Sequence, residues 1–334
     1  MNVLPKFSVI IPVYDRPHEV KELLDSLSRQ HNREFEVIIV EDGSSVKCDV
    51  VCKDYSGLIE ITYCYKENGG PAQARNWGAA KAKGEWLLFF DSDCIIPDHY
   101  FEAVVGELEK CECQLFGGAD RSHPSFTTLQ KAIDYSMTSI ITTGGIRGNR
   151  KSADKFYPRT FNMGIKKSVF DEIGGFSNMR FGEDVDFSYK VKEGGYDSRF
   201  FPEAWVYHKR RNTLKTFFKQ VFNSGIARIH LTKRHPGTLK PVHMLPALFV
   251  LGCIFLIMMS TILSFWFLFP IILLCLIIFT DAAMDKRGFK TSLYAIVASF
   301  TQLSGYGTGF LTGWWNICVL GKKNYAAFVK NFYR

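Results

Sequence analysis

The chain has 334 residues, long enough for two domains or for one large domain with an appendage. Its 41 lysines and arginines exceed its 33 aspartates and glutamates, which gives a formal net charge of +8. The excess is local, because nine basic residues and no acidic one lie between Lys209 and Lys240. Since this segment leads directly into a long uncharged tract, it favours an anionic lipid surface over nucleic acid as a partner.

The cysteines and the amino-terminal segment indicate the compartment. The nine cysteines form no Cys-x-x-Cys pair and no zinc-type spacing with histidine, so the sequence predicts no zinc site. No secretory signal precedes the first apolar segment, so we expect the front of the chain to fold in a reducing cytosol.

Short apolar segments alternate with helical patterns through the first hundred residues. This order is typical of a Rossmann-like parallel sheet flanked by helices. Asp15 is expected to cap the first helix, and Ser44 or Ser45 to start the second. Neither a Gly-x-Gly-x-x-Gly motif after the first strand nor a P-loop is present, which argues against a dinucleotide cofactor and an NTPase. We expect strands at residues 7–14, 35–40, 59–65 and 86–90.

The fourth predicted strand ends in two aspartates. Residues 86–90 are five large apolar side chains, which suit a strand buried on both faces. Asp91 and Asp93 follow, and side chains two positions apart on an extended segment point the same way. The pair therefore lies where open α/β sheets bind ligands, and its oxygens suit Mg²⁺ or Mn²⁺ shared with a diphosphate. The alternative is a solvated turn that caps the next helix.

Four motifs resemble those of the family 2 glycosyltransferases. They are Ser-Val-Ile-Ile-Pro-Val-Tyr-Asp (8–15), Val-Ile-Ile-Val-Glu-Asp-Gly-Ser (37–44), Gly-Pro-Ala-Gln-Ala-Arg-Asn-Trp-Gly (70–78) and Phe-Asp-Ser-Asp (90–93). The resemblance implies an α/β chain with the GT-A fold, a Rossmann-like mixed sheet flanked by helices, followed here by an α-helical membrane region. One departure is Glu41, where an aspartate is usual.

The resemblance also implies roles for single residues. Asp93 is expected to bind the metal, Mg²⁺ or Mn²⁺, with Asp91 on the metal or the ribose. From the residues alone, Asp42 is either an acceptor for a base or ribose or a turn residue before Gly43. The implied nucleotide-sugar site contains Pro12, Tyr14, Asp42, Arg75 and Asp91.

Two further sites follow in the next hundred residues. Glu183 and Asp184 come after a Gly-Gly-Phe turn, and acidic residues in a helix's first turn are favourable through the macrodipole alone. In the family, however, this pair enters the active site, which implies Asp184 as the catalytic base with Glu183 beside it. His208 ends the last predicted strand as a third metal ligand, as in some relatives, or as a surface histidine. The glycine-rich basic segment 144–151 is either a lid or phosphate grip, or a surface loop.

The last third of the chain indicates a membrane. Residues 241–280 carry no charge, and one helix of that length is about 60 Å long, twice a hydrocarbon core, so two spans are expected. In the third uncharged tract, glycines at every fourth position permit either close helix contact or a re-entrant hairpin. The predicted organisation is a catalytic domain (1–211), a basic amphipathic interfacial helix (212–240), a membrane region (241–321, with spans near 244–263, 266–284 and 291–319) and a basic tail (322–334).

Together these features predict an inverting, metal-dependent glycosyltransferase. Its expected donor is a nucleotide-diphosphate sugar, and its expected acceptor is a glycan, lipid-linked at the inner leaflet, in cell-surface polysaccharide synthesis. The catalytic domain is expected in the cytosol at the inner membrane, next to anionic lipids and without a nucleic-acid partner. The alternatives are a polyprenyl-phosphate glycosyl synthase and a non-catalytic membrane-bound nucleotide-sugar-binding protein.

Overall fold

The computed structural model describes residues 6–143, 157–285, 287–323 and 325–328. They form two compact units. The first contains residues 6–123 and 157–209, and the second contains 124–143 and the described residues from 210 onward.

The first unit is built on one mixed sheet of eight strands in the order β3-β2-β1-β4-β7-β6-β8-β5. β1 to β4 run parallel to one another, whereas β7 is antiparallel to both of its neighbours, β4 and β6. The strands are β1 (Phe7–Val13), β2 (Phe35–Asp42), β3 (Ile61–Lys66), β4 (Trp86–Phe89), β5 (Cys94–Ile95), β6 (Leu115–Arg121), β7 (Met163–Lys166) and β8 (Ser198–His208).

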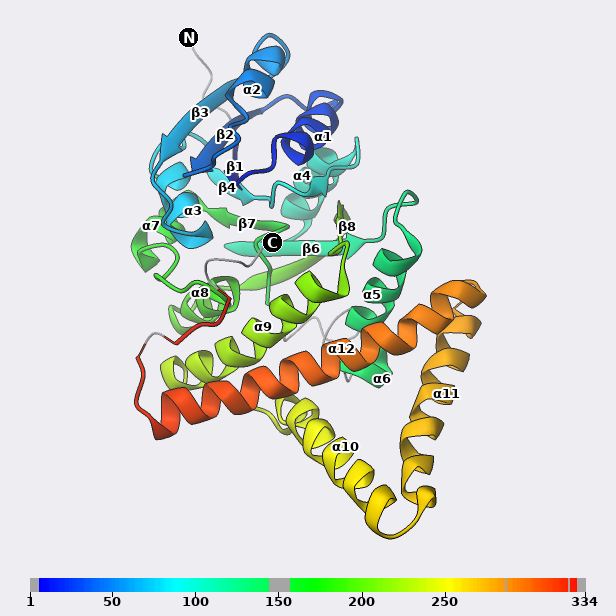
Figure 1. Ribbon diagram of the computed structural model, residues 1–334. Coiled ribbons are helices and arrows are strands. Elements are labelled where there is room, and N and C mark those ends of the chain that lie inside the picture. The colour runs from blue at the N-terminus through cyan, green and yellow to red at the C-terminus, as the bar shows by residue number, and fades with distance from the viewer. Residues whose placement is uncertain (1–5, 144–156, 286, 324, 329–334) are drawn as a thin grey trace. The chain divides into compact units, whose positions relative to one another are not determined.

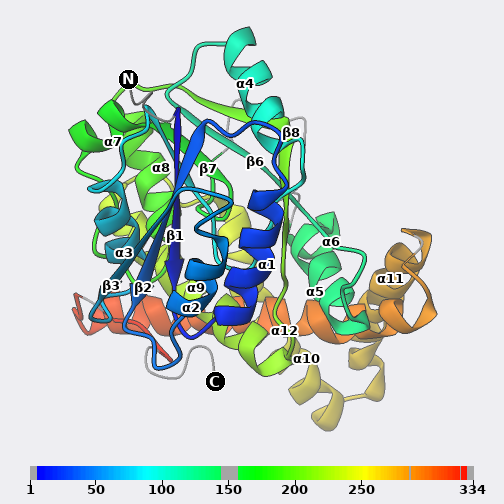
Figure 2. The same ribbon diagram turned by 90° about the horizontal axis from the view of Figure 1, so that it is seen from above.

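Helices cover both faces of this sheet, and α1 and α3 lie on opposite sides of β1 (Figures 1 and 2). One face packs against α1, α2 and α4, and the other against α3, α7 and α8. Burial on both faces explains the continuous apolar runs of β1, β2 and β4. The helices are α1 (Pro17–Ser28), α2 (Asp49–Tyr55), α3 (Pro71–Ala79), α4 (Tyr100–Lys110), α7 (Lys167–Ile173) and α8 (Glu183–Glu193).

The starts of the first two helices differ from the sequence prediction. Arg16, and not Asp15, is the N-cap residue of α1, and Asp15 Oδ1 instead accepts from the backbone N–H groups of Ser45 and Val46. Those contacts hold residues 44–46 in a loop, so α2 begins only at Asp49. Side-chain bonds between two loops therefore replaced the local caps that the sequence suggested.

The second unit is helical. Figure 1 shows α9 and α12 side by side, with α10 and α11 forming a hairpin. Ser139, whose backbone is extended, separates α5 from α6. The elements are α5 (Thr128–Thr138), α6 (Ile140–Thr143), α9 (Leu214–Arg234), α10 (Leu245–Ile262), α11 (Phe269–Met284) and α12 (Phe289–Gly313), with the 3₁₀ helices η2 (Pro241–His243) and η3 (Phe265–Leu268) and the π-helix η4 (Trp314–Val319).

Glycines allow α9 and α12 to pack backbone against backbone. A Cβ at Gly309 would lie 2.0 Å from the carbonyl oxygen of Phe222, and one at Gly225 would lie 2.3 Å from that of Tyr306. Of the two interpretations of the glycine repeat, close helix contact therefore fits, because α12 runs unbroken past these positions. The apolar side of α9, predicted to enter lipid, is covered by α12 in this unit.

Two segments among the described residues are long and apolar enough to cross a membrane, by length and composition only. They are Leu245–Ile262 and Phe265–Met284, each with a mean hydropathy of 2.4 and little burial. The third predicted span, 291–319, falls on α12, which is less apolar than α10 and α11 and buries more of its residues, and on η4, where Ile317 is buried. Crossing of the membrane by this part stays a prediction.

Helix α5 belongs to the second unit, whereas the sequence prediction placed it in a catalytic domain that ends at residue 211. Asp134 on α5 is buried, and its Oδ1 accepts from Nε and Nη2 of Arg210 at 3.1 and 2.9 Å. Its Oδ2 accepts from Arg287 Nη1 at 2.9 Å. A buried carboxylate shared by two guanidinium groups ties α5 to the helices that follow residue 209, although the sequence places it inside the catalytic domain.

Candidate active site

The parallel strands bring the candidate residues to one edge of the sheet. β1 pairs with β2 on one side and with β4 on the other, so their carboxyl ends meet at the same edge. Pro12 lies near the end of β1, and Tyr14 follows that strand directly. Asp42 ends β2, and the segment with Asp91 and Asp93 follows β4. The predicted grouping of these residues at one edge is what the strand order produces.

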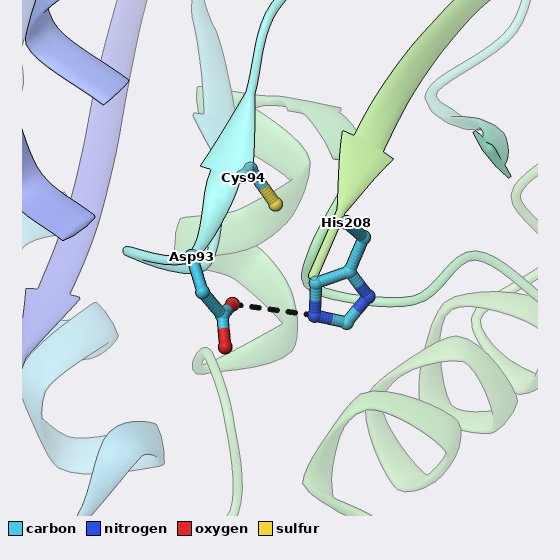
Figure 3. Close-up of side chains that lie close together, drawn as sticks. All are labelled: Asp93, Cys94 and His208. Atoms are coloured by element: carbon cyan, nitrogen blue, oxygen red, sulfur yellow. Dashed lines mark ion pairs between the residues drawn. The ribbon is translucent and has the colours of Figure 1, made fainter. Parts of the chain in front are cut away.

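His208 lies close to the two aspartates although it ends β8, which is three places away from β4 in the sheet. Figure 3 shows its imidazole facing Asp93, with 3.3 Å between Nε2 and Oδ1. The same nitrogen lies 3.9 Å from Asp91 Oδ2. β8 pairs with β5 so that His208 is opposite Cys94, and the ring stacks on Phe161 at 4.7 Å between centroids. Strand pairing and aromatic stacking thus orient the ring toward the carboxylates.

The side chains here fit a hard divalent cation. Ligand atoms of Asp93, Cys94 and His208 lie within 4.8 Å of one another. The Cys94 thiol donates to the Phe161 carbonyl at 3.5 Å, and burial together with the nearby Asp93 and Asp91 raises its pKa well above the ordinary value. A protonated thiol is a poor ligand, which leaves carboxylate oxygens and an imidazole, the donor set that Mg²⁺ and Mn²⁺ accept.

Arg16 is a neighbour of Asp93 that sequence reasoning missed. Its Nη1 lies 2.5 Å from Asp93 Oδ2, on the carboxylate whose other oxygen faces His208. The available signal was its position directly after the motif at residues 8–15. Because β1 and β4 are adjacent parallel strands, residues that follow them are expected to meet.

Arg75 connects two parts of the site. Its side chain is 3% exposed, with Nη2 2.6 Å from Asp91 Oδ1 and Nη1 2.8 Å from Glu183 Oε1. Burial alone lowers the pKa of this guanidinium, but Asp91 and Glu183 outweigh burial and raise it. Among the described residues, its buried Nε has no hydrogen-bond partner. The predicted contact of Arg75 with a nucleotide stays a prediction, since both amino nitrogens bind carboxylates here.

Glu183 and Asp184 occupy the first turn of α8, as the sequence predicted, but in different surroundings. Glu183 is buried, and burial raises its pKa to about 7 although Arg75 and the helix start oppose the shift. Asp184 is 16% exposed, with Oδ2 3.0 Å from Arg159 Nε. Of the two carboxylates, Asp184 is thus the more open to an incoming hydroxyl.

Asp42 is engaged by its own chain. Its carboxylate is buried and accepts from Lys66 Nζ at 2.6 Å and from the backbone N–H groups of Gly69 and Gly70 at 2.9 and 2.8 Å. These bonds shape the loop that leads into α3. The predicted nucleotide contact of Asp42 is untested, and the predicted lid or phosphate grip at 144–151 lies outside the described residues.

A mixed sheet with acidic side chains at the carboxyl ends of its parallel strands is the arrangement of the GT-A fold. Residues 8–174 match the family model described as glycosyl transferase family 2, which is half of the chain. The chain belongs to glycosyl transferase family 2. The predicted family and fold class are therefore confirmed.

Relatives and solved structures agree with this assignment. An uncharacterized glycosyltransferase of Haemophilus influenzae is 33% identical over 229 residues, 63% of this chain and 71% of that protein. The minor teichoic acid biosynthesis protein GgaB of Bacillus subtilis is 26% identical over 54% of this chain, but only 20% of its own length is matched. The mannosyltransferase PcManGT of Pyrobaculum calidifontis, solved with GDP-Man and Mn²⁺, has a TM-score of 0.59 at 17% identity, covering 90% of this chain and 88% of that one. This last likeness shows the fold.

Proposed function

We propose that this protein is an inverting, metal-dependent glycosyltransferase that moves a sugar from a nucleotide-diphosphate sugar to an acceptor hydroxyl. The observation that carries the proposal is the convergence of Asp91, Asp93 and His208, which Arg75 connects to the start of the helix that bears Asp184. Arg75 joins the two halves through Asp91 and Glu183. Family membership supports the reaction class, and the PcManGT complex with GDP-Man and Mn²⁺ supports a similar donor and metal.

In this proposal Asp91, Asp93 and His208 hold Mg²⁺ or Mn²⁺. The cation, when bound, offsets the negative charge that develops on the departing diphosphate. The nucleotide sugar lies along the ends of β1, β2 and β4, where Pro12, Tyr14, Asp42 and Arg75 lie. Arg75 fixes Asp91 from within the protein, so that carboxylate needs little reorganisation on binding.

Asp184 is the proposed base. The acceptor oxygen attacks the anomeric carbon from the face opposite the diphosphate, a new C–O bond forms, and the old bond breaks with its electron pair leaving on the diphosphate. The acceptor proton passes to Asp184, whose carboxylate is oriented by Arg159 and by the N–H of Val185 at 2.8 Å. Glu183 remains in its ion pair with Arg75 and does not contact the acceptor.

We place the acceptor on a lipid at the inner leaflet of the cytoplasmic membrane, in cell-surface polysaccharide synthesis, with the catalytic domain in the cytosol. The support is the apolar hairpin of α10 and α11, the basic residues at 209–240, and GgaB among the relatives. A lipid-linked acceptor puts the reacting hydroxyl at the membrane surface, where an anchored enzyme finds it by two-dimensional diffusion.

A screen of donors tests the proposal. The purified full chain in lipid nanodiscs is titrated with UDP-, GDP- and dTDP-sugars in the presence of Mn²⁺, and transfer to membrane lipid extracts is followed by mass spectrometry. Binding of one class together with a glycosylated lipid product is expected. A product whose sugar is attached directly to a lipid phosphate would instead indicate a polyprenyl-phosphate glycosyl synthase. Donor binding without transfer or hydrolysis would indicate a non-catalytic binding protein.

A further inference from the structure

The guanidinium of Arg16 forms an ion pair with Asp93, one of the proposed metal ligands. We propose that Arg16 competes with the divalent cation for Asp93, so that metal binds tightly only when a nucleotide diphosphate arrives to take over the guanidinium. The inference rests on the proposed metal site. It adds a positioning residue that couples metal binding to donor binding.

The ion pair between Arg16 and Asp93 is strong, and it occupies a carboxylate oxygen that the metal would need. Arg16 Nη1 is 2.5 Å from Asp93 Oδ2, and the side chains are 20% and 15% exposed, so solvent screens the pair only partly. Charge-assisted hydrogen bonds of this kind are roughly twice as strong as neutral ones. Because the single charge of Asp93 is already matched, a divalent cation gains less attraction from it than from a free carboxylate.

The backbone that carries Arg16 is fixed, so only the side chain of Arg16 can move when it competes with the metal for Asp93. Asp15, directly before it, has a positive φ of 52°, a left-handed conformation that aspartate adopts when its side chain bonds to nearby backbone groups. Two hydrogen bonds to its Oδ1, from Ser45 N at 2.6 Å and Val46 N at 2.9 Å, hold it there, and its own N–H donates to Ser44 Oγ at 2.8 Å. The hydrogen-bonded turn therefore fixes the backbone of Arg16 and leaves any change of partner to its side chain.

The two arginines of the site differ in their ability to move. Arg75 is 3% exposed and bound to two carboxylates, whereas Arg16 is partly exposed beside the proposed diphosphate position. A guanidinium binds phosphate oxygens in two-point geometry as readily as it binds a carboxylate. A nucleotide diphosphate thus offers the Arg16 guanidinium phosphate oxygens in exchange for Asp93 and releases Asp93 to the metal. By linkage, the metal must tighten nucleotide binding by the same factor.

The test measures this coupling by calorimetry on the full chain in nanodiscs, with Mn²⁺ titrated alone and in the presence of UDP, GDP or dTDP. In the wild type, one of these three nucleotides is expected to tighten Mn²⁺ binding. In Arg16→Gln, Mn²⁺ alone should bind about tenfold more tightly, and the nucleotide effect should shrink by the same factor, as expected for loss of one charge-assisted bond. Arg16→Lys keeps the charge and should lie between the two, and it replaces Arg16→Gln if that variant melts early.

Matched controls separate the inference from the proposed function. Arg29 also lies at an end of α1 and pairs with Asp98 at 3.4 Å in exposed surroundings, so Arg29→Gln should behave as the wild type. Asp93→Asn tests the metal site alone, and unchanged Mn²⁺ binding there would remove the metal from the proposed function. If Asp93→Asn weakens Mn²⁺ but Arg16→Gln leaves both affinity and coupling unchanged, Arg16 is only a structural partner and the inference is overturned. A wild type without coupling to any of the three nucleotides overturns it as well.

Discussion

Arg75 donates to Glu183 across 108 positions of sequence, at 2.8 Å between Nη1 and Oε1, and yet the pKa of Glu183 stays near 7. The reason is that both groups are buried, and the loss of hydration of the carboxylate outweighs the attraction of the guanidinium. Helix α8, which carries the proposed base, is therefore fastened to α3 by a pair whose charge changes within the physiological pH range.

The first prediction concerns stability against pH. The pKa of Glu183 is raised from 4.5 to about 7, so the folded state binds more protons than the unfolded state between these values. The free energy of unfolding should fall as pH rises from 5 to 8, by at most about 3 kcal/mol, and level off above that. In Glu183→Gln, which cannot titrate, the melting temperature should change less over this range. Parallel pH curves for wild type and variant, measured by thermal unfolding, would contradict the assignment. Glu102→Gln, an exposed carboxylate on α4, is the control.

The second prediction concerns the base. Asp184→Asn removes the proton acceptor but keeps the size, so the transfer rate should fall at least about a hundredfold while donor affinity barely changes. If Asp184 only stabilises the helix start, the cost should be well under about 1 kcal/mol and the rate nearly normal. Glu102→Gln changes the charge in the first turn of α4 and serves as the control for the dipole. Fully buried Asp186 is unsuitable for that purpose, because its amide would perturb the core. Equal modest losses in both variants would remove Asp184 as the base.

The third prediction concerns His208. If its Nε2 is a metal ligand beside Asp93, His208→Phe should keep the stacking on Phe161 and weaken Mn²⁺ binding about tenfold or more. The control variant is His31→Phe, since His31 is exposed and lies 3.4 Å from the carboxylate of Glu102, which is also exposed. Titration calorimetry with Mn²⁺ decides the matter. Unchanged affinity in His208→Phe would leave the histidine with an orienting role for the aspartates.

The fourth prediction concerns the helix pair of the second unit. A methyl group at Gly309 meets the Phe222 carbonyl at 2.0 Å, so Gly309→Ala should destabilise the protein by about 1–3 kcal/mol. At Gly252 on α10, nothing lies within 4 Å of a Cβ, and Gly252→Ala should be neutral or slightly stabilising. Thermal unfolding in one detergent compares the two. A Gly309→Ala protein as stable as Gly252→Ala would mean that α9 and α12 do not pack this closely.

Local pattern was enough to predict β1 to β4 and the acidic residues that follow β2 and β4. The apolar runs of β1, β2 and β4, and the stripe of Val20, Leu23, Leu24 and Leu27 on α1, each depend on neighbours a few residues away. The aspartates at the strand ends follow from the order of the strands.

What the sequence left open depends on contacts between distant segments. Arg16 meets Asp93 only because β1 and β4 are neighbours, and Arg75 meets Glu183 only because α3 and α8 share one face of the sheet. The contacts of Asp134 are also long-range, because its partners Arg210 and Arg287 lie far along the chain. These ion pairs explain why α5 belongs to the second unit and not to the predicted catalytic domain. Periodicity carries no information about such pairs.

Glu41 has a consequence for how this chain tolerates change. It is fully buried, accepts from the Ser44 hydroxyl with one oxygen and from the Cys48 N–H at 2.8 Å with the other, and so closes the loop that holds Asp15. An aspartate, the usual residue in the family, is one methylene shorter and would give up one of these two partners. In chimeras of this chain with its relatives, residue 41 and the loop 44–48 should therefore be exchanged together. A chimera with its junction between them should fold less well than either parent.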